Sequence, residues 1–142
     1  MTSMTNYLEG QLIAHIFRTS SFTKPGAIAI ALSTSAGLDT VTGASMSEVA
    51  NSNNYSRVLV SPGDSNWAAP VANNGTTSNV GAITFPQASG SWGTVNSVVV
   101  VDSATYGAGN ALFYGVLAVA KAVTSGDTFS FAAAALTIQL DN

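Results

Sequence analysis

The sequence predicts a mainly β protein, an antiparallel β-sandwich or barrel-like domain with one N-terminal amphipathic helix. Short apolar and β-branched runs recur between positions 27 and 140, and Gly, Asn and Pro separate them. One segment near the N-terminus instead repeats its apolar residues with the period of a helix. The length of 142 residues suits one domain, so we expect residues 1–142 to form a single β-rich unit.

The helix is expected at about residues 7–18. Thr5 or Asn6 can cap its start, and Glu9 follows Asn6 at the spacing of a capping box. Apolar side chains form a stripe along one face: Leu8, Leu12, Ile13, Ile16 and Phe17. Gly10 weakens the helix by about 1 kcal/mol relative to Ala, so tertiary packing must hold it.

Between the helix and position 81, strands are sparse. Residues 27–33 form an apolar run typical of a buried strand, and residues 55–60 alternate between two faces. Residues 34–54 are expected to form a loop, which is unusually long unless it has a task such as reaching a neighbour. A second polar stretch, 65–81, carries the turn signal Asn74-Gly75.

The remaining part predicts strands more clearly. Five runs are expected to be strands: 82–85, 95–102, 111–119, 128–131 and 136–140. Tyr106–Asn110 holds two glycines and is typical of a hairpin loop, and Ser125-Gly126-Asp127 of a turn. We expect the last two runs to be a strand pair or one long bent strand.

Charge is scarce in this chain. Charged residues make up 8% of it, against about 25% in an ordinary soluble domain. The net charge of −3 leaves no basic patch for phosphates, so we expect no nucleic-acid partner. Interface cores are depleted in Lys, Glu and Asp, so partner subunits are expected to cover much of the surface. An unusually neutral soluble domain is the alternative.

The chain is not expected to enter a membrane or a secretion route. No apolar stretch reaches the ~18–20 residues of a spanning helix, and residues 1–20 lack the pattern of a signal peptide. The absence of cysteine fits an intracellular origin, so synthesis in the host cytoplasm is expected.

We expect no enzyme activity and no catalytic, cofactor-binding or metal site. His15 lacks the neighbouring His, Cys or clustered carboxylates that a metal site needs, so a structural or surface role is expected. Asp64 and Asp127 follow glycine in turns, where Asp normally accepts hydrogen bonds from its own backbone. Gly107-Ala108-Gly109 is followed by no helix pattern, so it is expected to be a hairpin turn and not a phosphate cradle.

The aromatic residues are the remaining candidates for binding. Phe113 and Tyr114 are adjacent in a strand, so one should enter the core while the other could face outward. Trp67 and Trp92 lie in loops or at strand ends, where each either anchors a contact or covers the core. A sugar-binding stack would need a polar cluster beside the ring, and the sequence indicates none.

Several short stretches together form a family pattern. They are Thr5-Asn6-Tyr7-Leu8-Glu9, Phe17-Arg18, Phe22, Ile83-Thr84-Phe85-Pro86, Trp92-Gly93-Thr94-Val95, Val101-Asp102-Ser103-Ala104-Thr105, Leu112-Phe113-Tyr114-Gly115, Lys121, Gly126-Asp127-Thr128 and Leu136-Thr137-Ile138. This pattern resembles a family of small tailed-bacteriophage virion proteins, often labelled tail fibre or hypothetical phage proteins. The resemblance fails in the loops 34–54 and 63–80. Its motifs are turns and core positions, so it implies a virion component without catalytic residues.

From the resemblance and the low charge we expect a capsid decoration, or cement, protein that binds the outer shell and stabilises it. The expected partners are the major capsid protein and copies of the chain itself, as a homotrimer on the capsid surface. The helix and the N-terminal residues are the candidates for the clamp to the shell. The first alternative is a tail or fibre-associated structural or host-binding protein, which exposed aromatics at one end would favour. The second is a small glycan hydrolase, which would need two carboxylates converging in a cleft.

Overall fold

The computed structural model describes residues 2–70 and 75–140, and these form one helix and nine strands. Helix α1 spans Asn6–Phe17. The strands are β1 (Ser3–Met4), β2 (Ala29–Ser33), β3 (Val58–Leu59), β4 (Thr76–Ser78), β5 (Ile83–Thr84), β6 (Gly93–Val101), β7 (Ala111–Val123), β8 (Ser130–Phe131) and β9 (Thr137–Gln139). The protein is therefore mainly β with one N-terminal helix, as the sequence predicts.

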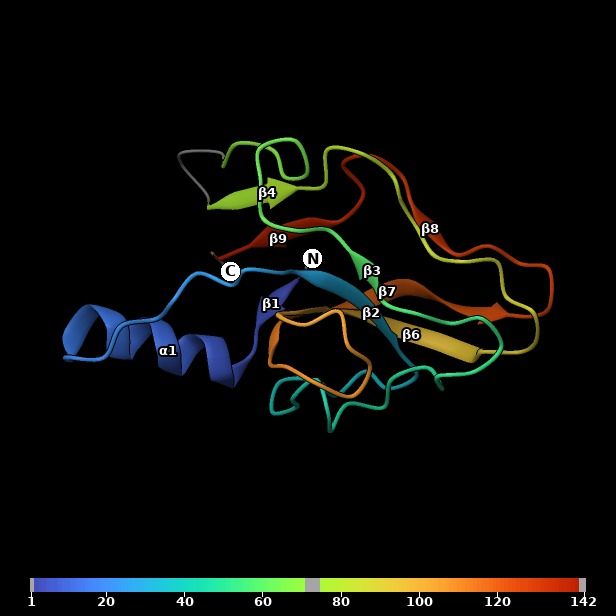
Figure 1. The fold of residues 1–142 in the computed structure, drawn as a ribbon, viewed down its shortest axis with the longest axis horizontal. Helices are drawn as coiled ribbons and strands as arrows, with labels where there is room; N and C mark the ends of the chain where they lie inside the picture. The colour runs from blue at the N-terminus through green and yellow to red at the C-terminus, as the bar shows by residue number, and fades with distance from the viewer. Residues whose placement is uncertain (1, 71–74, 141–142) are drawn as a thin grey trace.

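The strands build three antiparallel sheets (Figure 1). The largest holds five strands in the order β1-β7-β6-β2-β3, while β4 pairs with β9 and β5 pairs with β8. In Figure 1, β4, β9 and β8 lie above the five-stranded sheet as a second layer. The described strands thus stack as a sandwich, and none of their sheets closes into a barrel.

The main core lies between these two layers. Ile30 and Val100 extend from the five-stranded sheet toward Ile83 and Ile138 of the small sheets, and all four side chains are buried. Aromatic rings fill the space around them, with neighbouring centroids 5.3–6.5 Å apart: Tyr55, Phe85, Trp92 and Phe129. Alternation along β2 and β6 therefore decides which side chains enter this core.

The opposite face of the five-stranded sheet is also covered. Small side chains such as Ala31 and Val99 point to this face, and Leu38 and Met46 from the loop 34–54 pack on them. The loop is held at the sheet edge, where the backbone N–H of Val49 donates to Leu32 O at 3.0 Å. The long loop therefore covers the sheet of its own chain.

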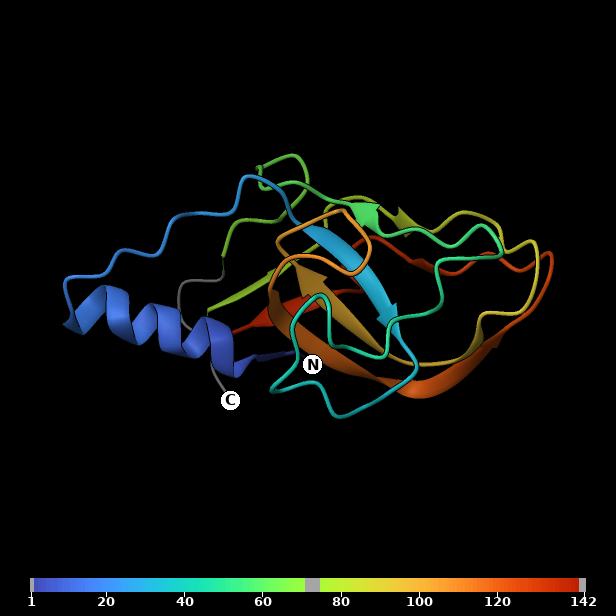
Figure 2. The ribbon, with the colours of Figure 1, turned by 60° about the horizontal axis from the view of Figure 1, so that its bottom comes forward.

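Helix α1 extends away from the sandwich (Figure 2). Leu8 is its buried residue. The chain then returns along residues 18–28 to the start of β2, beside the helix (Figure 2). The helix begins one residue earlier than expected, because Thr5 is its N-cap. It ends at Phe17, one residue before the expected end. The pairing of Asn6 with Glu9 is therefore not the cap of this helix.

The expectations for the strands are wrong in three places. The strand expected at 55–60 is reduced to Val58–Leu59. The runs 128–131 and 136–140 do not pair with each other, since β8 pairs with β5 and β9 with β4. The sequence predicts neither β1 nor β4, because runs of two or three residues are too short to show a strand pattern. Asn74 of the expected turn Asn74-Gly75 lies outside the described residues.

Strand β7 is four residues longer than the expected 111–119, and it contains a large bulge. Between the pairs Val95–Lys121 and Ser97–Val116, β6 advances by two residues while β7 advances by five. Val119 lies in this bulge and is 81% exposed. Bulges twist a strand and interrupt its edge, so this edge is poorly suited to add a further regular strand.

Candidate functional site

The start of helix α1 is held firmly on the sandwich. Thr5 Oγ1 accepts a hydrogen bond from Leu8 N–H at 3.4 Å and donates to Ala111 O at 2.6 Å. Thr5 N–H donates to Leu112 O, and Asn6 N–H donates to Asp39 O, both at 3.0 Å. Because these bonds join the helix to β7 and to the loop 34–54, they set the direction in which the helix leaves the sandwich.

The far part of α1 carries an apolar surface that the described part of the chain leaves exposed. Ile13 is 61% exposed, Ile16 67% and Phe17 77%. Their spacing of three and four residues places them on one face of the helix, and we call these three residues the α1 patch. Burying a side chain of this size contributes about 1.5–3 kcal/mol, so the patch is a strong candidate for a contact with another molecule. Within the described residues, the buried contact of this helix is at its base, at Leu8.

His15 has a structural role in this region. Its Nδ1 accepts a hydrogen bond from the backbone N–H of Phe22 at 3.2 Å. This bond joins the helix to the returning segment 18–28. Among the described residues, no group of three His, Cys, Asp or Glu side chains could hold a metal ion.

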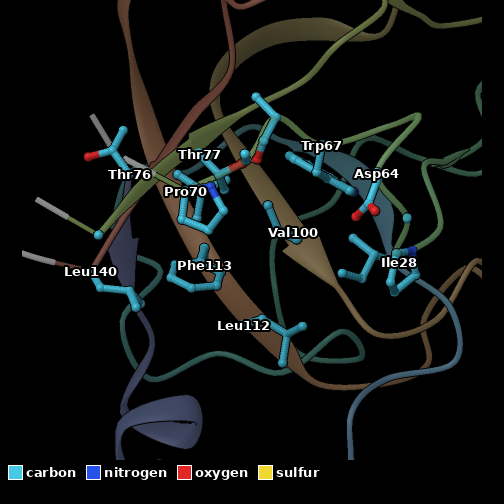
Figure 3. Close-up of a pocket in the computed structure, with 16 residues that line it drawn as sticks. Ile28, Asp64, Trp67, Pro70, Thr76, Thr77, Val100, Leu112, Phe113 and Leu140 are labelled. Carbon is cyan, nitrogen blue, oxygen red and sulfur yellow. The ribbon is translucent and has the colours of Figure 1, made fainter. Parts of the chain in front are cut away.

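An apolar pocket of about 710 Å³ opens beside the strands of the second layer (Figure 3). Trp67, Phe113 and Leu140 line it. Ile28, the residue before β2, and Val100 of β6 line it as well. Sites that bind small molecules have volumes of about 300–1,000 Å³ and mostly apolar walls, so this pocket is large enough to bind several bulky side chains.

The polar residues at this pocket do not form a catalytic arrangement. Asp64 lines it and is exposed, and no hydrogen bond or ion pair of its carboxylate is found within residues 2–70 and 75–140. The expectation that Asp64 bonds its own turn is therefore wrong. Trp67 donates through Nε1–H to Val60 O at 3.1 Å, which leaves its ring as a wall of the pocket.

Asp127 behaves as the sequence predicts. Its Oδ2 accepts hydrogen bonds from the backbone N–H of Thr124 at 2.8 Å and from the Thr124 hydroxyl at 2.9 Å. These bonds to the turn lower the pKa of the Asp127 carboxyl below its ordinary value. Asp127 is thus a turn residue.

A buried ion pair joins Arg57 to Glu48 of the loop 34–54, and the sequence did not indicate it. Arg57 Nη2 is 2.7 Å from Glu48 Oε2, and Arg57 Nε is 2.8 Å from Glu48 Oε1. The remaining guanidinium N–H groups donate to backbone oxygens of Gly43, Ser103 and Ala108 at 2.8–2.9 Å. All five donors of the guanidinium are therefore used, and none remains to bind a substrate.

Tyr55 completes this group. Its hydroxyl donates to Glu48 Oε1 at 3.0 Å and accepts from Leu32 N–H at 3.0 Å. Burial raises the pKa of the Tyr55 hydroxyl well above its ordinary value, and the nearby Glu48 carboxylate raises it further. The group ties the loop 34–54 to the loop after β6, so its role is structural. Arg57 within so weakly charged a sequence is the one signal that could have indicated it.

The structure places the aromatic residues whose position the sequence left open. Phe113 packs on the main core and Tyr114 on the second core, so neither side chain of this pair faces outward freely. Trp92 is buried and donates through Nε1–H to Asn53 O at 2.9 Å. Trp67 is therefore the tryptophan that remains for an external contact.

Comparison with known proteins gives one family. The family model described as Podophage GP4 fiber I protein gp80 matches residues 3–139. No curated protein matches the chain. Among the described residues, no helix has the length and apolar character to cross a bilayer.

Proposed function

Because the chain belongs to the family described as Podophage GP4 fiber I protein gp80, a family of bacteriophage structural proteins, we propose that it is a subunit of a virion fibre. It would act by assembly with other virion subunits through its exposed apolar surfaces. The capsid decoration role expected from the sequence is the competing assignment, and the family description favours the fibre.

The α1 patch is the observation that carries the assembly role. A chain that worked alone would gain nothing from a helix whose three large apolar side chains are 61–77% exposed. Exposed charges are also few: Arg57 is buried against Glu48, which leaves Arg18, Lys24 and Lys121 as cations available to the surroundings. Both features support a subunit whose surface is covered by partners.

The described residues offer little for catalysis. The buried ion pair has no free donor, and the apolar pocket holds one carboxylate, Asp64, without a second beside it among its lining residues. This arrangement supports a structural role over the glycan hydrolase alternative, which requires two converging carboxylates.

Location in the virion tests this proposal. Purified virions would be analysed by quantitative mass spectrometry, with the chain measured against the major capsid protein, and labelled with antibody to the β-sandwich for electron microscopy. A fibre subunit gives a few or a few dozen copies and label on fibres. A ratio near one copy per capsid subunit, with label over the shell, would overturn the fibre assignment in favour of the capsid decoration role. Absence of the chain from virions would contradict both assignments.

A further inference from the structure

We propose that the α1 patch of one copy of this chain docks in the apolar pocket of a second copy. The patch is Ile13, Ile16 and Phe17, and the pocket is the one that Trp67 and Phe113 line. The inference deepens the proposed fibre function, because it names the partner through which α1 assembles.

The helix cannot fill the pocket of its own chain. Thr5 bonds to Ala111 O and Leu112 O, and Asn6 bonds to Asp39 O, so the base of α1 is fixed beside β7. From that base the helix extends away from the sandwich, and its far end carries the patch (Figures 1 and 2). Twelve residues of helix span about 18 Å, which places the patch well beyond its own base. A second copy can receive it where the same copy cannot.

Shape and apolar character agree between the two surfaces. The patch is convex, since it lies on one face of a protruding helix, and the pocket is a concave space of about 710 Å³. The exposed surface of Ile13, Ile16 and Phe17, together with the pocket wall that they cover, would bury on the order of 600 Å². That value is below the ~1,200 Å² of a specific interface, so a stable assembly must use the contact more than once.

Charge agrees as well. Arg18 follows Phe17 directly and is exposed, while Asp64 lines the pocket with no ion pair found in the described chain. Lys24 lies on the returning segment beside the helix and adds a second cation to the same end. Docking the patch would bring this cationic end toward the one carboxylate at the pocket. In a chain with so few charges, this complementarity favours one orientation of the contact.

The patch and the pocket are different surfaces, so the contact is heterologous. Each copy can give its patch to one neighbour and receive a patch from another. Such contacts repeat around a closed ring or along a filament, and both multiply the area of a single contact.

The absence of cysteine permits a direct test by cross-linking. Thr19→Cys, at an exposed position two residues after Phe17, would be introduced into one preparation, so that the patch stays intact. Ala69→Cys would be introduced into a second, tagged preparation, because Ala69 is an exposed residue of the pocket wall. We expect a disulfide-linked heterodimer when the two are mixed under mild oxidation. Val119→Cys replaces Ala69→Cys in the control, since Val119 is exposed at a distant bulge, and it should give little heterodimer.

Charge reversal supplies the second measurement. By sedimentation equilibrium, Asp64→Arg and Arg18→Asp should each weaken self-association about tenfold or more, a loss typical of a significant contact, and the double variant should restore much of it. The proposal would be overturned by a monomer at all concentrations, by disulfide linkage of Thr19→Cys copies to each other in place of the heterodimer, or by the absence of any effect of charge reversal. The location of the chain in the virion is measured by a separate experiment. A failure of the docking proposal therefore leaves the fibre assignment in place, and a failure of the fibre assignment leaves the docking proposal in place.

Discussion

At the scale of single residues, the unusual feature is a fully paired arginine inside a weakly charged protein. The Arg57 side chain has no exposed surface, and its five N–H groups bond Glu48 and three backbone oxygens. Burying a charge is costly unless every donor is satisfied, and the geometry here satisfies all of them. The pair therefore depends on both partners remaining in place.

Removing one partner should be strongly destabilising. In Glu48→Gln, Arg57 remains buried with no opposing charge, and we expect the free energy of unfolding to fall by about 3–5 kcal/mol. Urea unfolding followed by circular dichroism measures this, with the exposed Glu9→Gln as the matched control. A loss below about 1 kcal/mol would contradict the assigned role.

Tyr55 predicts a dependence of stability on alkaline pH. Its pKa is raised in the folded protein, whereas an unfolded Tyr releases its proton near pH 10. Above about pH 10 the folded state therefore binds more protons than the unfolded state, so this contribution is present below pH 10 and is lost as pH rises.

Tyr55→Phe tests that sign. The variant should lose stability less steeply than the parent between about pH 9 and 11. Tyr106→Phe is the control, because Tyr106 is 39% exposed. Equal slopes for the parent and Tyr55→Phe would show that Tyr55 does not keep its proton in the fold.

At the scale of elements, α1 is a helix whose start is tightly bonded to the sandwich, while its far end is exposed and bonded to the returning segment through His15. Gly10 is in its interior, and a Cβ added there would meet no atom within 4 Å. Gly10→Ala should therefore stabilise α1 by about 1 kcal/mol.

Helix ends open locally without unfolding of the core, so this gain is best measured on the helix itself. Amide hydrogen exchange should slow in α1 and stay unchanged in β6. Gly81→Ala is a control, since Gly81 also has open space but lies outside helices and strands. Unchanged exchange in α1 would mean that Gly10 does not limit its stability.

At the scale of the whole molecule, the five-stranded sheet is covered on both faces, on one side by small sheets and on the other by the loop 34–54. Leu38 is 1% exposed in that second core. We expect Leu38→Ala to cost about 2–5 kcal/mol of unfolding free energy, a value typical of a core residue. Val119→Ala, at an exposed position, should stay within about 0.5 kcal/mol. Similar values for both variants would contradict the covering role of the loop.

The assembly proposed above also belongs to this scale. A ring or filament of copies connects the exposed helix, the apolar pocket and the scarcity of charge in one arrangement. If copies associate through α1, the solution mass should rise with concentration and fall when Phe17 is replaced by Ser. Sedimentation of the parent and of Phe17→Ser measures both.

The sequence by itself determined the features that depend on near neighbours in the chain. The mainly β class, the helix that follows Thr5, the hairpin between β6 and β7 and the turn at Asp127 all follow from local periodicity and from residues that favour turns. The family resemblance rests on the same local stretches, and the match over residues 3–139 confirms it.

The tertiary structure alone decided what meets across long separations. Ser3 pairs with Tyr114, and the loop residue Glu48 forms an ion pair with Arg57. No local sequence pattern encodes these contacts. The exposed α1 patch has the same origin, because an apolar stripe predicts burial without saying against which molecule. The physical reason is that propensity acts through each residue's own backbone, whereas pairing and burial depend on the whole chain.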